Sequence, residues 1–430
     1  MLKVGLTGGI ASGKTHVLRG LAEAGFHTLD LDAVSRDVMA PGGTAYRDVV
    51  DAFGPAIVGE GGAIDRKALG ARVFADESAR RRLESLVHPR IRQSEALHLA
   101  AAVAGEVAVV DAALLVESGQ HLRFARLVVV HCEPEEQLRR LMARDGLAEP
   151  AARARLQAQM PPGEKRRFGH LVIDTSGTLA ETDRQVDAVV ATLRALASDE
   201  TPKPAIPAER AVSAMAVGPS RGPRGLHPWR VVEEIAASGD LDMARMAALI
   251  DRPTGEPWYR MAMSGASGQE APETLALPVA MWAGGRRPGD EPFAIAAAAT
   301  MARLTHTDPA GLSGAVLAVL AALHFLTTGS AADMRARVAD WRAAAAAWTG
   351  APPPSSTMVT ILAAAAHAGD GEAAAREAGG KGGVADLASA LSGASPAAVA
   401  TSTDPARADT AAVDPARKAQ VARILAPRVA

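Results

Sequence analysis

The sequence predicts an α/β domain with a parallel sheet, followed by a second, all-α domain, and three observations support this division. Up to about residue 196, short β-branched apolar runs alternate with segments of helical periodicity, which is typical of a parallel sheet with helices on both faces. Residues 197–228 are rich in proline and small residues and predict a linker. Residues 229–394 are alanine-rich with helical periods, and residues 395–430, which repeat Asp-Pro-Ala-Arg, predict a largely disordered tail with at most a short terminal helix.

The individual elements of the first domain follow from the same patterns. Continuous apolar runs of four to eight residues are expected of strands buried on both faces. Helices are expected where apolar residues recur at helical spacing beside charged ones. The predicted strands are Leu2–Leu6, Phe26–Leu29, Val107–Val110, Leu127–Val130 and Leu171–Ile173, and the clearest helices are 16–22, 135–144 and 151–159.

Composition excludes several classes of protein. A formal net charge of -2 gives no global electrostatic case for binding nucleic acid or an anionic membrane. The single cysteine, Cys132, excludes an intrachain disulfide and fits a reducing compartment. The longest apolar run, 315–326, is shorter than the roughly 20 residues of a membrane span. We therefore expect a cytoplasmic protein.

Residues 8–15 read Gly-Gly-Ile-Ala-Ser-Gly-Lys-Thr, a complete GxxxxGK[ST] phosphate-binding loop between a predicted strand and a predicted helix. Glycines let backbone N–H groups converge on phosphates at a helix N-terminus, where orphan donors and the helix dipole favour anions. Lys14 would pair with the β- and γ-phosphates of a nucleoside triphosphate, and Thr15 would place its hydroxyl on Mg²⁺. A chance match in a glycine-rich chain is the alternative, and the flanking elements argue against it.

Carboxylates follow two of the predicted strands. Asp30 and Asp32 come after the second strand, where one of them can orient an acceptor hydroxyl and take its proton; capping the next helix is the alternative. Asp111 ends the third strand and would hold Mg²⁺ through water, or cap the next segment. The apolar stretch 112–117 suits a wall of the acceptor pocket.

Basic residues gather farther along the chain. Arg139, Arg140 and Arg144 stand on one predicted helix, and Arg153, Arg155 and 165–167 follow it. A mobile arginine-bearing segment that closes over ATP supplies positive charge as the γ-phosphoryl group leaves. For most of these arginines a solvated basic face is the simpler interpretation.

These residues occur in an order and at a spacing that resemble the dephospho-coenzyme A kinase family, over the whole of residues 1–196. The resemblance rests on several short motifs: 6–10 with 12–14, Asp30-x-Asp32, His88-Pro89 with Ile91-Arg92, Asp111-x-x-Leu114-Leu115-x-Glu117, Arg140-Leu141, 144–146, 159–161 and Lys165. It implies a P-loop kinase fold with a helical acceptor and lid insert. It also implies transfer of the ATP γ-phosphoryl group to the ribose 3′-hydroxyl of dephospho-coenzyme A, which is phosphotransfer to an alcohol acceptor and the last step of coenzyme A synthesis.

The resemblance also assigns roles to residues. Asp32 would be the general base, Lys14 the phosphate clamp and Arg140 the lid arginine. The nucleotide would contact Gly8, Gly9, Ile10, Ala11, Ser12, Gly13, Lys14, Thr15, His16 and Arg144; dephospho-coenzyme A would contact Asp32, Arg36, His88, Leu114, Leu115 and Glu117; and Mg²⁺ would be held by Thr15 and Asp111.

Three positions depart from the family pattern. Ala11 stands where the family often has glycine, which we interpret as a loop position that does not need a positive φ. Thr175 replaces a common asparagine near the adenine, and His170 stands where aspartate is common. None of the three is expected to touch the phosphate chemistry, so any effect should fall on adenine affinity.

Residues 264–326 faintly resemble the ADP-ribosylglycohydrolase family, an all-helical fold with a two-magnesium site. The resemblance rests on Leu277-Pro278, on 304–309 and on the apolar helix 312–326. Lys381 and Gly383 stand where that family has aspartates, so a metal site is not expected. His306 and Asp308 are better explained by a turn between two helices.

Two rival functions stay open. The first is another small-substrate P-loop kinase. The second is a binding or regulatory protein in which an inactive kinase-like domain serves the C-terminal domain. Lys14, Thr15, Asp32 and Arg140 are all present, which favours the enzyme.

Overall fold

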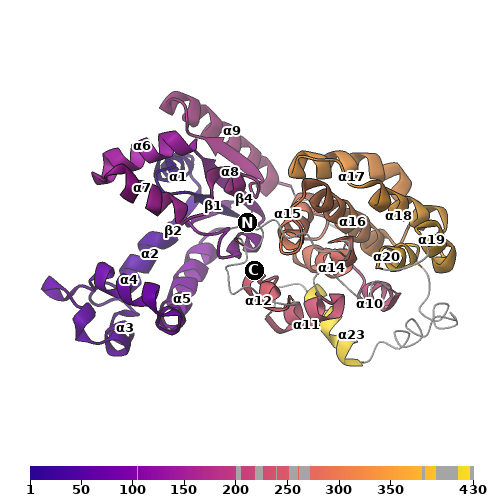
Figure 1. Ribbon diagram of the computed structural model, residues 1–430, viewed down its shortest axis with the longest axis horizontal. Coiled ribbons are helices and arrows are strands. Elements are labelled where there is room, and N and C mark those ends of the chain that lie inside the picture. Colours follow the sequence, from indigo (N-terminus) through magenta and orange to yellow (C-terminus); the bar gives the residue numbers. More distant parts are fainter. Residues whose placement is uncertain are drawn as a thin grey trace. The chain divides into compact units, whose positions relative to one another are not determined.

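A computed structural model describes the chain except for residues 104, 200–204, 218–225, 239, 251–259, 261–271, 380–382, 394–414 and 427–430. The chain forms two compact units, Met1–Leu115 with Phe124–Glu200 and Val116–Arg123 with Thr201–Ala430 (Figure 1). The division near residue 200 lies where the composition changes. The segment Val116–Arg123, which the sequence placed in the first domain, belongs to the second unit.

The first unit is built on a five-stranded parallel sheet in the order β2-β3-β1-β4-β5. All five predicted strands are present, and the α/β fold class is confirmed. The connection after β1 runs to β2 on one side of the sheet order, whereas the connection after β3 crosses β1 to reach β4 on the other side. Ligands bind at such a change of direction, beyond the carboxyl ends of the strands. The strands are β1 (Leu2–Gly8), β2 (His27–Asp30), β3 (Val107–Asp111), β4 (Arg126–His131) and β5 (Leu171–Asp174).

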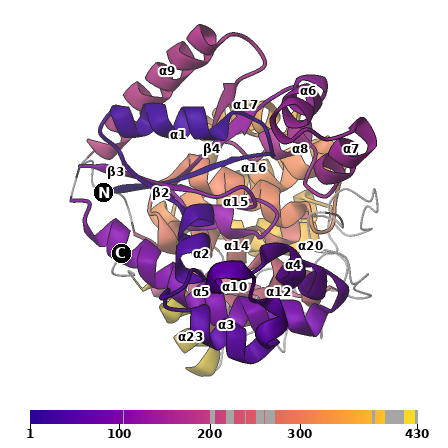
Figure 2. The same ribbon diagram turned by 90° about the vertical axis from the view of Figure 1, so that its left-hand side faces the viewer.

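Two helices, α1 (Lys14–Glu23) and α9 (Leu179–Ala197), cover one face of this sheet, and Figure 2 shows them on the same side of the strands. Their apolar sides pack on alternate residues of β1, β3 and β4, in a core whose members include Leu21, Leu193 and Val128. Helix α9 begins with a capping box between Thr178 and Glu181. On the opposite face, Leu115 and Phe124 approach β1 at Gly5, where no Cβ keeps them away.

A helical insert between β2 and β3 has its own small core, formed by residues such as Val49, Phe53 and Val87. Aspartates cap three of its helices, because a carboxylate accepts hydrogen bonds from the unpaired N–H groups of a first turn. The insert comprises α2 (Leu31–Val38), α3 (Tyr46–Phe53), η1 (Pro55–Ile57), η2 (Glu60–Gly62), α4 (Arg66–Ala75) and α5 (Glu77–Ala100).

A second group of helices follows β4 and packs against residues 10 and 11 of the phosphate-binding loop. It comprises α6 (Pro134–Asp145), α7 (Glu149–Gln157) and α8 (Pro162–Arg166). The predicted helices 135–144 and 151–159 correspond to α6 and α7. The structure therefore places the arginine-bearing segment beside the glycine loop.

The described part of the second unit is helical, as predicted. Its helices are η3 (Gln120–Arg123), α10 (Ala208–Val217), α11 (Pro228–Ser238), α12 (Met243–Ala248), η5 (Pro272–Leu275), α14 (Ala276–Arg286), α15 (Glu291–Ala302), α16 (Pro309–Thr328), α17 (Met334–Thr349), α18 (Ser355–Ala366), α19 (Gly371–Glu377), α20 (Gly383–Leu391) and α23 (Pro415–Leu425). Within this unit, the Nε2 atom of His121 lies 3.1 Å from the Thr300 hydroxyl of α15.

The expectation of a linker at 197–228 needs correction. Helix α10 lies within that segment and buries Ala211, Ala214 and Met215. The segment contains apolar residues at helical spacing, which outweighed the signal from the neighbouring prolines. Helix α23 is the short terminal helix that the sequence allowed within the tail, and it buries Val421 and Ile424. The predicted disorder of 395–414 falls outside the described residues.

Helix α16 is longer than its uninterrupted apolar run suggested. By length and composition it could cross a membrane, and it is the one described helix that passes this test, but 83% of its apolar window is buried inside the structure. That burial is typical of a core helix. Asp308 caps its start by accepting a 2.6 Å hydrogen bond from the backbone of Gly311, so the turn expected at 304–309 is present.

Candidate active site

The glycine loop connects β1 to α1 at the point where the sheet's connections diverge. Gly13 precedes the helix with φ 82°, a conformation that favours glycine. A Cβ on Gly8 would lie 2.6 Å from the Ser12 hydroxyl and 2.8 Å from the Val130 carbonyl oxygen, so no larger residue fits there. The loop therefore requires glycine at its first and sixth positions for two different physical reasons.

Ala11 corrects one expectation. Its φ is 60°, which makes it the one non-glycine residue with a positive φ among those described, so the position does adopt the conformation that glycine favours. For an L-residue this region costs roughly 1–2 kcal/mol. The methyl group of Ala11 packs near Leu138 and Leu141, and that contact offsets part of the strain.

We expect Ala11→Gly to change the free energy of unfolding by less than about 1 kcal/mol, because relief of strain offsets lost packing and the greater flexibility of the unfolded chain. Ala188→Gly, at an exposed position inside α9, is the matched control and should lose about 1 kcal/mol. Urea denaturation measures both variants. An equal loss in the two variants would show that Ala11 carries no strain.

Two glutamines hold the loop from outside, and no role was predicted for either of them. The side-chain amide of Gln137 in α6 donates a 2.5 Å hydrogen bond to the carbonyl of Ile10. The side-chain oxygen of Gln159 accepts a 2.8 Å hydrogen bond from the N–H of Ile10. Gln137 is buried, and a Cβ on Gly9 would collide with it. A polar residue inside the apolar stripe of a predicted helix is the signal that could have found Gln137.

Lys14 and Asp111 form an ion pair at the carboxyl ends of β1 and β3. The ammonium of Lys14 lies 2.5 Å from both carboxylate oxygens of Asp111, whose side chain is only 3% exposed. Burial raises the pKa of Asp111 to about 6, the negative charges of Asp30 and Asp32 add to the increase, and Lys14 opposes it. The structure thus brings Lys14 and three carboxylates together.

The structure separates the two carboxylates after β2. Asp30 caps α2 by accepting hydrogen bonds of 2.8 Å and 3.0 Å from the backbone N–H groups of Asp32 and Ala33. Asp32 is exposed in the first turn of the same helix. Asp30 therefore has the capping role that was the alternative for this pair, and Asp32 does not.

The residues predicted for the acceptor differ in accessibility. Leu114 is 49% exposed, whereas Leu115 is 2% exposed and packs toward β1, so Leu114 is the one able to contact a ligand. Arg36 is exposed on α2, 3.9 Å from a carboxylate oxygen of Asp30, and His88 is exposed on α5. Glu117 is buried and belongs to the second unit.

Lys165 also belongs to this site, and no role was predicted for it beyond its place in the family motif. Its side chain is 1% exposed, and its ammonium donates a 2.9 Å hydrogen bond to the carbonyl of Ala113. The hydroxyl of Thr7 donates to the same carbonyl at 3.1 Å. Together they anchor the segment between Asp111 and Leu114.

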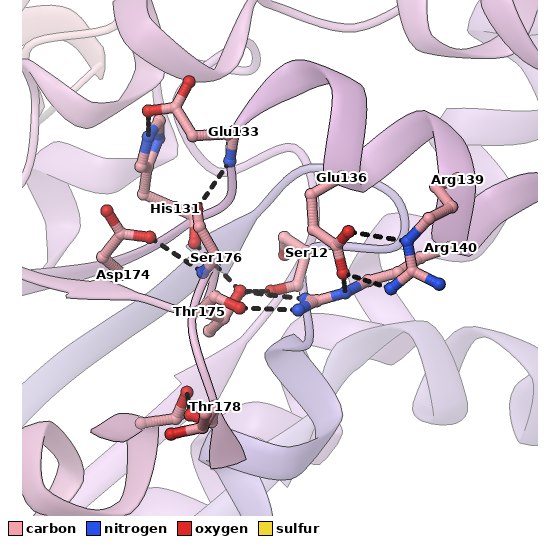
Figure 3. A network of polar contacts seen from close by, with 11 residues as sticks. Ser12, His131, Glu133, Glu136, Arg139, Arg140, Asp174, Thr175, Ser176 and Thr178 are labelled. Atoms are coloured by element: carbon pink, nitrogen blue, oxygen red, sulfur yellow. Dashed lines mark hydrogen bonds and ion pairs between the residues drawn. The ribbon is translucent and has the colours of Figure 1, made fainter. Parts of the chain in front are cut away.

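The predicted nucleotide contacts of the helices have protein partners in the structure. His16 lies 2.6 Å from Asp183 of α9, and Arg144 is half-exposed and paired with Asp145. Arg140 donates to Glu136 at 2.7 Å and to the Thr175 carbonyl at 2.6 Å (Figure 3). Hydrogen bonds from Arg139 and Arg140 hold the pKa of Glu136 at about 2. Arg140 is thus anchored beside the loop, and Arg144 has the freer guanidinium.

The site offers two oxygen ligands of the type that Mg²⁺ prefers. Thr15 is exposed in the first turn of α1, and the carboxylate of Asp111 faces Lys14. Magnesium is commonly bound through one or two carboxylates together with substrate phosphates and water. The described residues include no cluster of three histidine, cysteine or carboxylate side chains able to hold a metal by themselves. Thr15 and Asp111 therefore fit an ion that arrives with a nucleotide.

Comparison with known proteins agrees with this geometry. The sequence profile of the family described as dephospho-CoA kinase matches residues 2–181. The chain is 48% identical to a dephospho-CoA kinase of Geobacter sulfurreducens over 188 residues, which cover 43% of this chain and 95% of the relative. It is 44% identical to one of Leifsonia xyli over 197 residues, 45% of this chain and 100% of the relative.

Solved structures also match less than half of the chain. A crystal structure from Thermus thermophilus is 35% identical, covers 45% of this chain and 97% of its own, and has a TM-score of 0.41. A dephospho-CoA kinase from Campylobacter jejuni is 24% identical, covers 44% and 96%, and has a TM-score of 0.32. The matched residues cover 95% and 100% of these two sequence relatives, at 48% and 44% identity. The chain therefore belongs to the dephospho-CoA kinase family.

Proposed function

We propose that the N-terminal unit transfers the γ-phosphoryl group of ATP to the ribose 3′-hydroxyl of dephospho-coenzyme A, which gives ADP and coenzyme A. The observation that carries this proposal is the meeting of Lys14, Asp111 and Asp32 at the carboxyl edge of β1, β3 and β2. The family's kinase activity supports the same reaction.

Each group has a step to perform. The loop from Gly8 to Thr15 binds the phosphates through backbone N–H groups, and Lys14 leaves Asp111 to contact the β- and γ-phosphates. Asp32 accepts a hydrogen bond from the 3′-hydroxyl and takes its proton as the new P–O bond forms. Arg140 and Arg144 offset the negative charge that develops on the leaving ADP.

Thr15 and Asp111 would hold Mg²⁺, which neutralises phosphate charge when it is bound. This role explains why a carboxylate lies buried beside Lys14. Once the lysine moves to the phosphates, Asp111 needs another positive partner, since an unpaired buried charge is costly. Mg²⁺ would supply that positive partner for Asp111 when it is bound.

Acceptor dependence tests the proposal. With ATP and Mg²⁺, we expect the full-length protein to release ADP when dephospho-coenzyme A is added and not when coenzyme A, whose 3′-position already carries phosphate, is added instead. A coupled assay for ADP follows the reaction. AMP presents a similar ribose without the pantetheine arm, so equal turnover with AMP would favour another small-substrate kinase. An absence of acceptor-dependent turnover would exclude the kinase function.

The C-terminal helical unit stands outside this chemistry, because every residue to which we give a step in the reaction lies in the first unit. We propose that it is an appended domain with a structural, binding or regulatory role. A cytoplasmic location is part of the proposal, as the single cysteine favours a reducing compartment.

A further inference from the structure

Thr175, the residue after β5, lies at the centre of a polar network beside the phosphate-binding loop (Figure 3). Its side chain is buried and contacts three separate segments of the first unit. The hydroxyl lies 2.7 Å from the carbonyl oxygen of Ser12 in the loop and 3.0 Å from that of His131 at the end of β4. We expected Thr175 to affect adenine affinity and not the phosphate chemistry, yet its hydroxyl contacts the backbone of the phosphate-binding loop itself.

The number of hydrogen bonds that a hydroxyl can donate and accept determines which of these contacts are strong. A threonine hydroxyl has one proton to donate and two lone pairs that accept. The shorter contact, to Ser12, is the better donor bond, while the hydroxyl oxygen accepts from the Nη1 atom of Arg140 at 3.2 Å. Thr175 thus connects the loop to the arginine of α6.

The bond to Ser12 sets the direction of the loop backbone. In a trans peptide the C=O and the N–H point in opposite directions, so a carbonyl of Ser12 held toward Thr175 turns the N–H of Gly13 to the other side. Gly13 has φ 82°, and a Cβ there would lie 3.5 Å from Thr175. In a phosphate-binding loop the N–H groups on that side form the anion site.

Arg140 is held at both ends of the same network. Its Nη2 atom donates 2.6 Å to the Thr175 carbonyl, and its Nε atom donates 2.7 Å to Glu136. Three donor contacts on a planar guanidinium fix its orientation. Loss of the Thr175 hydroxyl would therefore free one side of Arg140 as well as the Ser12 carbonyl.

We propose that Thr175 is a positioning residue for nucleotide binding, whose hydroxyl orients the Ser12–Gly13 peptide toward the phosphates and aligns Arg140. The link between Thr175 and catalysis rests on the proposed function. The main expected effect of the Thr175 hydroxyl is on the affinity for the nucleotide. That consequence can be measured without any acceptor.

The test compares Thr175→Val, which keeps the shape and removes the hydroxyl, with Thr175→Ser, which keeps the hydroxyl. We expect Thr175→Val to raise the Kd for ADP and the KM for ATP about threefold to tenfold, the range for one lost hydrogen bond, and to leave the KM for dephospho-coenzyme A unchanged. Thr175→Ser should stay within about twofold of the wild type. Calorimetric titration with ADP and initial-rate kinetics supply these values.

Thr182→Val is the matched control, because Thr182 is equally buried and its hydroxyl bonds only 3.2 Å to the Thr178 carbonyl within α9, away from the loop. It should leave ADP affinity unchanged. If Thr175→Val lowers stability, the increase in Tm caused by ADP, taken from each variant's own baseline, still reports affinity.

Three results would overturn the proposal: wild-type ADP affinity in Thr175→Val, equal losses in the valine and serine variants, or an equal loss in Thr182→Val. If the wild type binds ADP but has no turnover with dephospho-coenzyme A, the proposed function fails while the binding comparison still decides the role of Thr175.

Discussion

Asp32→Asn is expected to lower kcat for dephospho-coenzyme A by about a hundredfold to ten-thousandfold, the range for loss of a general base. The Asp32 carboxylate is exposed in the first turn of α2 and lies close enough to Asp111 to raise the pKa of Asp111. The helix does not need Asp32 as a cap, because Asp30 has that role. Asparagine keeps the size of the side chain and removes the proton acceptor. Initial rates at saturating ATP and acceptor measure kcat directly.

The control for Asp32→Asn is Asp37→Asn, an exposed aspartate farther along the same helix. It should have wild-type kcat, which separates loss of the base from a general change in charge on α2. ADP affinity should be unchanged in both variants, because neither residue belongs to the glycine loop. Substantial turnover by Asp32→Asn would transfer the role of base to another group and leave the kinase function intact.

Lys14→Met should affect both catalysis and stability. We expect kcat/KM for ATP to fall about a hundredfold to a thousandfold, since a preorganised positive group at the transferring phosphate is lost. We also expect about 3 kcal/mol less stability at pH 8, because Asp111 becomes a buried carboxylate without its partner. The second effect gives the variant a distinctive dependence on pH.

The sign of that dependence follows from the pKa of Asp111. Burial raises the pKa of Asp111 from 3.8 to about 6 in the folded protein. At pH values between these two pKa values, the folded state therefore binds a proton more readily than the unfolded state. Stability from this group therefore falls as pH rises from about 4 to about 6. Without the opposing charge of Lys14 the folded pKa rises further, and the window extends to higher pH.

Thermal unfolding at pH 5 and pH 8 measures this dependence. Relative to the wild type, Lys14→Met should lose more stability at pH 8 than at pH 5, and adding Asp111→Asn should restore most of the loss. Lys67→Met, which removes an exposed lysine from α4, should behave as the wild type at both pH values. A loss in Lys14→Met that does not change with pH would contradict the assignment of the ion pair.

Several features of the site could be predicted because they depend on local sequence. A strand, a glycine loop and a helix follow one another within the first 23 residues, and their chemistry depends on backbone geometry that glycine spacing encodes. Asp30 and Asp111 end neighbouring strands, and the carboxyl ends of parallel strands meet at one edge of a sheet. Their proximity therefore follows from topology alone.

Other features could not be predicted because they depend on the direction of side chains. Leu114 and Leu115 are chemically identical neighbours, and only the path of the chain after β3 exposes one and buries the other. Asp30 and Asp32 are likewise equivalent in sequence until α2 begins at residue 31 and selects its cap. The positive φ of Ala11 is imposed by a loop whose two ends are fixed by β1 and α1.

By itself, the sequence determined the α/β and all-α parts, the phosphate-binding loop and the reaction that its acceptor-side residues support. Only the tertiary structure decided that Thr175, Gln137 and Gln159 hold this loop, that helix α10 forms, and that Val116–Arg123 belongs to the helical unit. The physical reason is distance along the chain. A hydrogen bond between Thr175 and Ser12 joins residues 163 positions apart, and no local pattern encodes which side chain will meet which carbonyl.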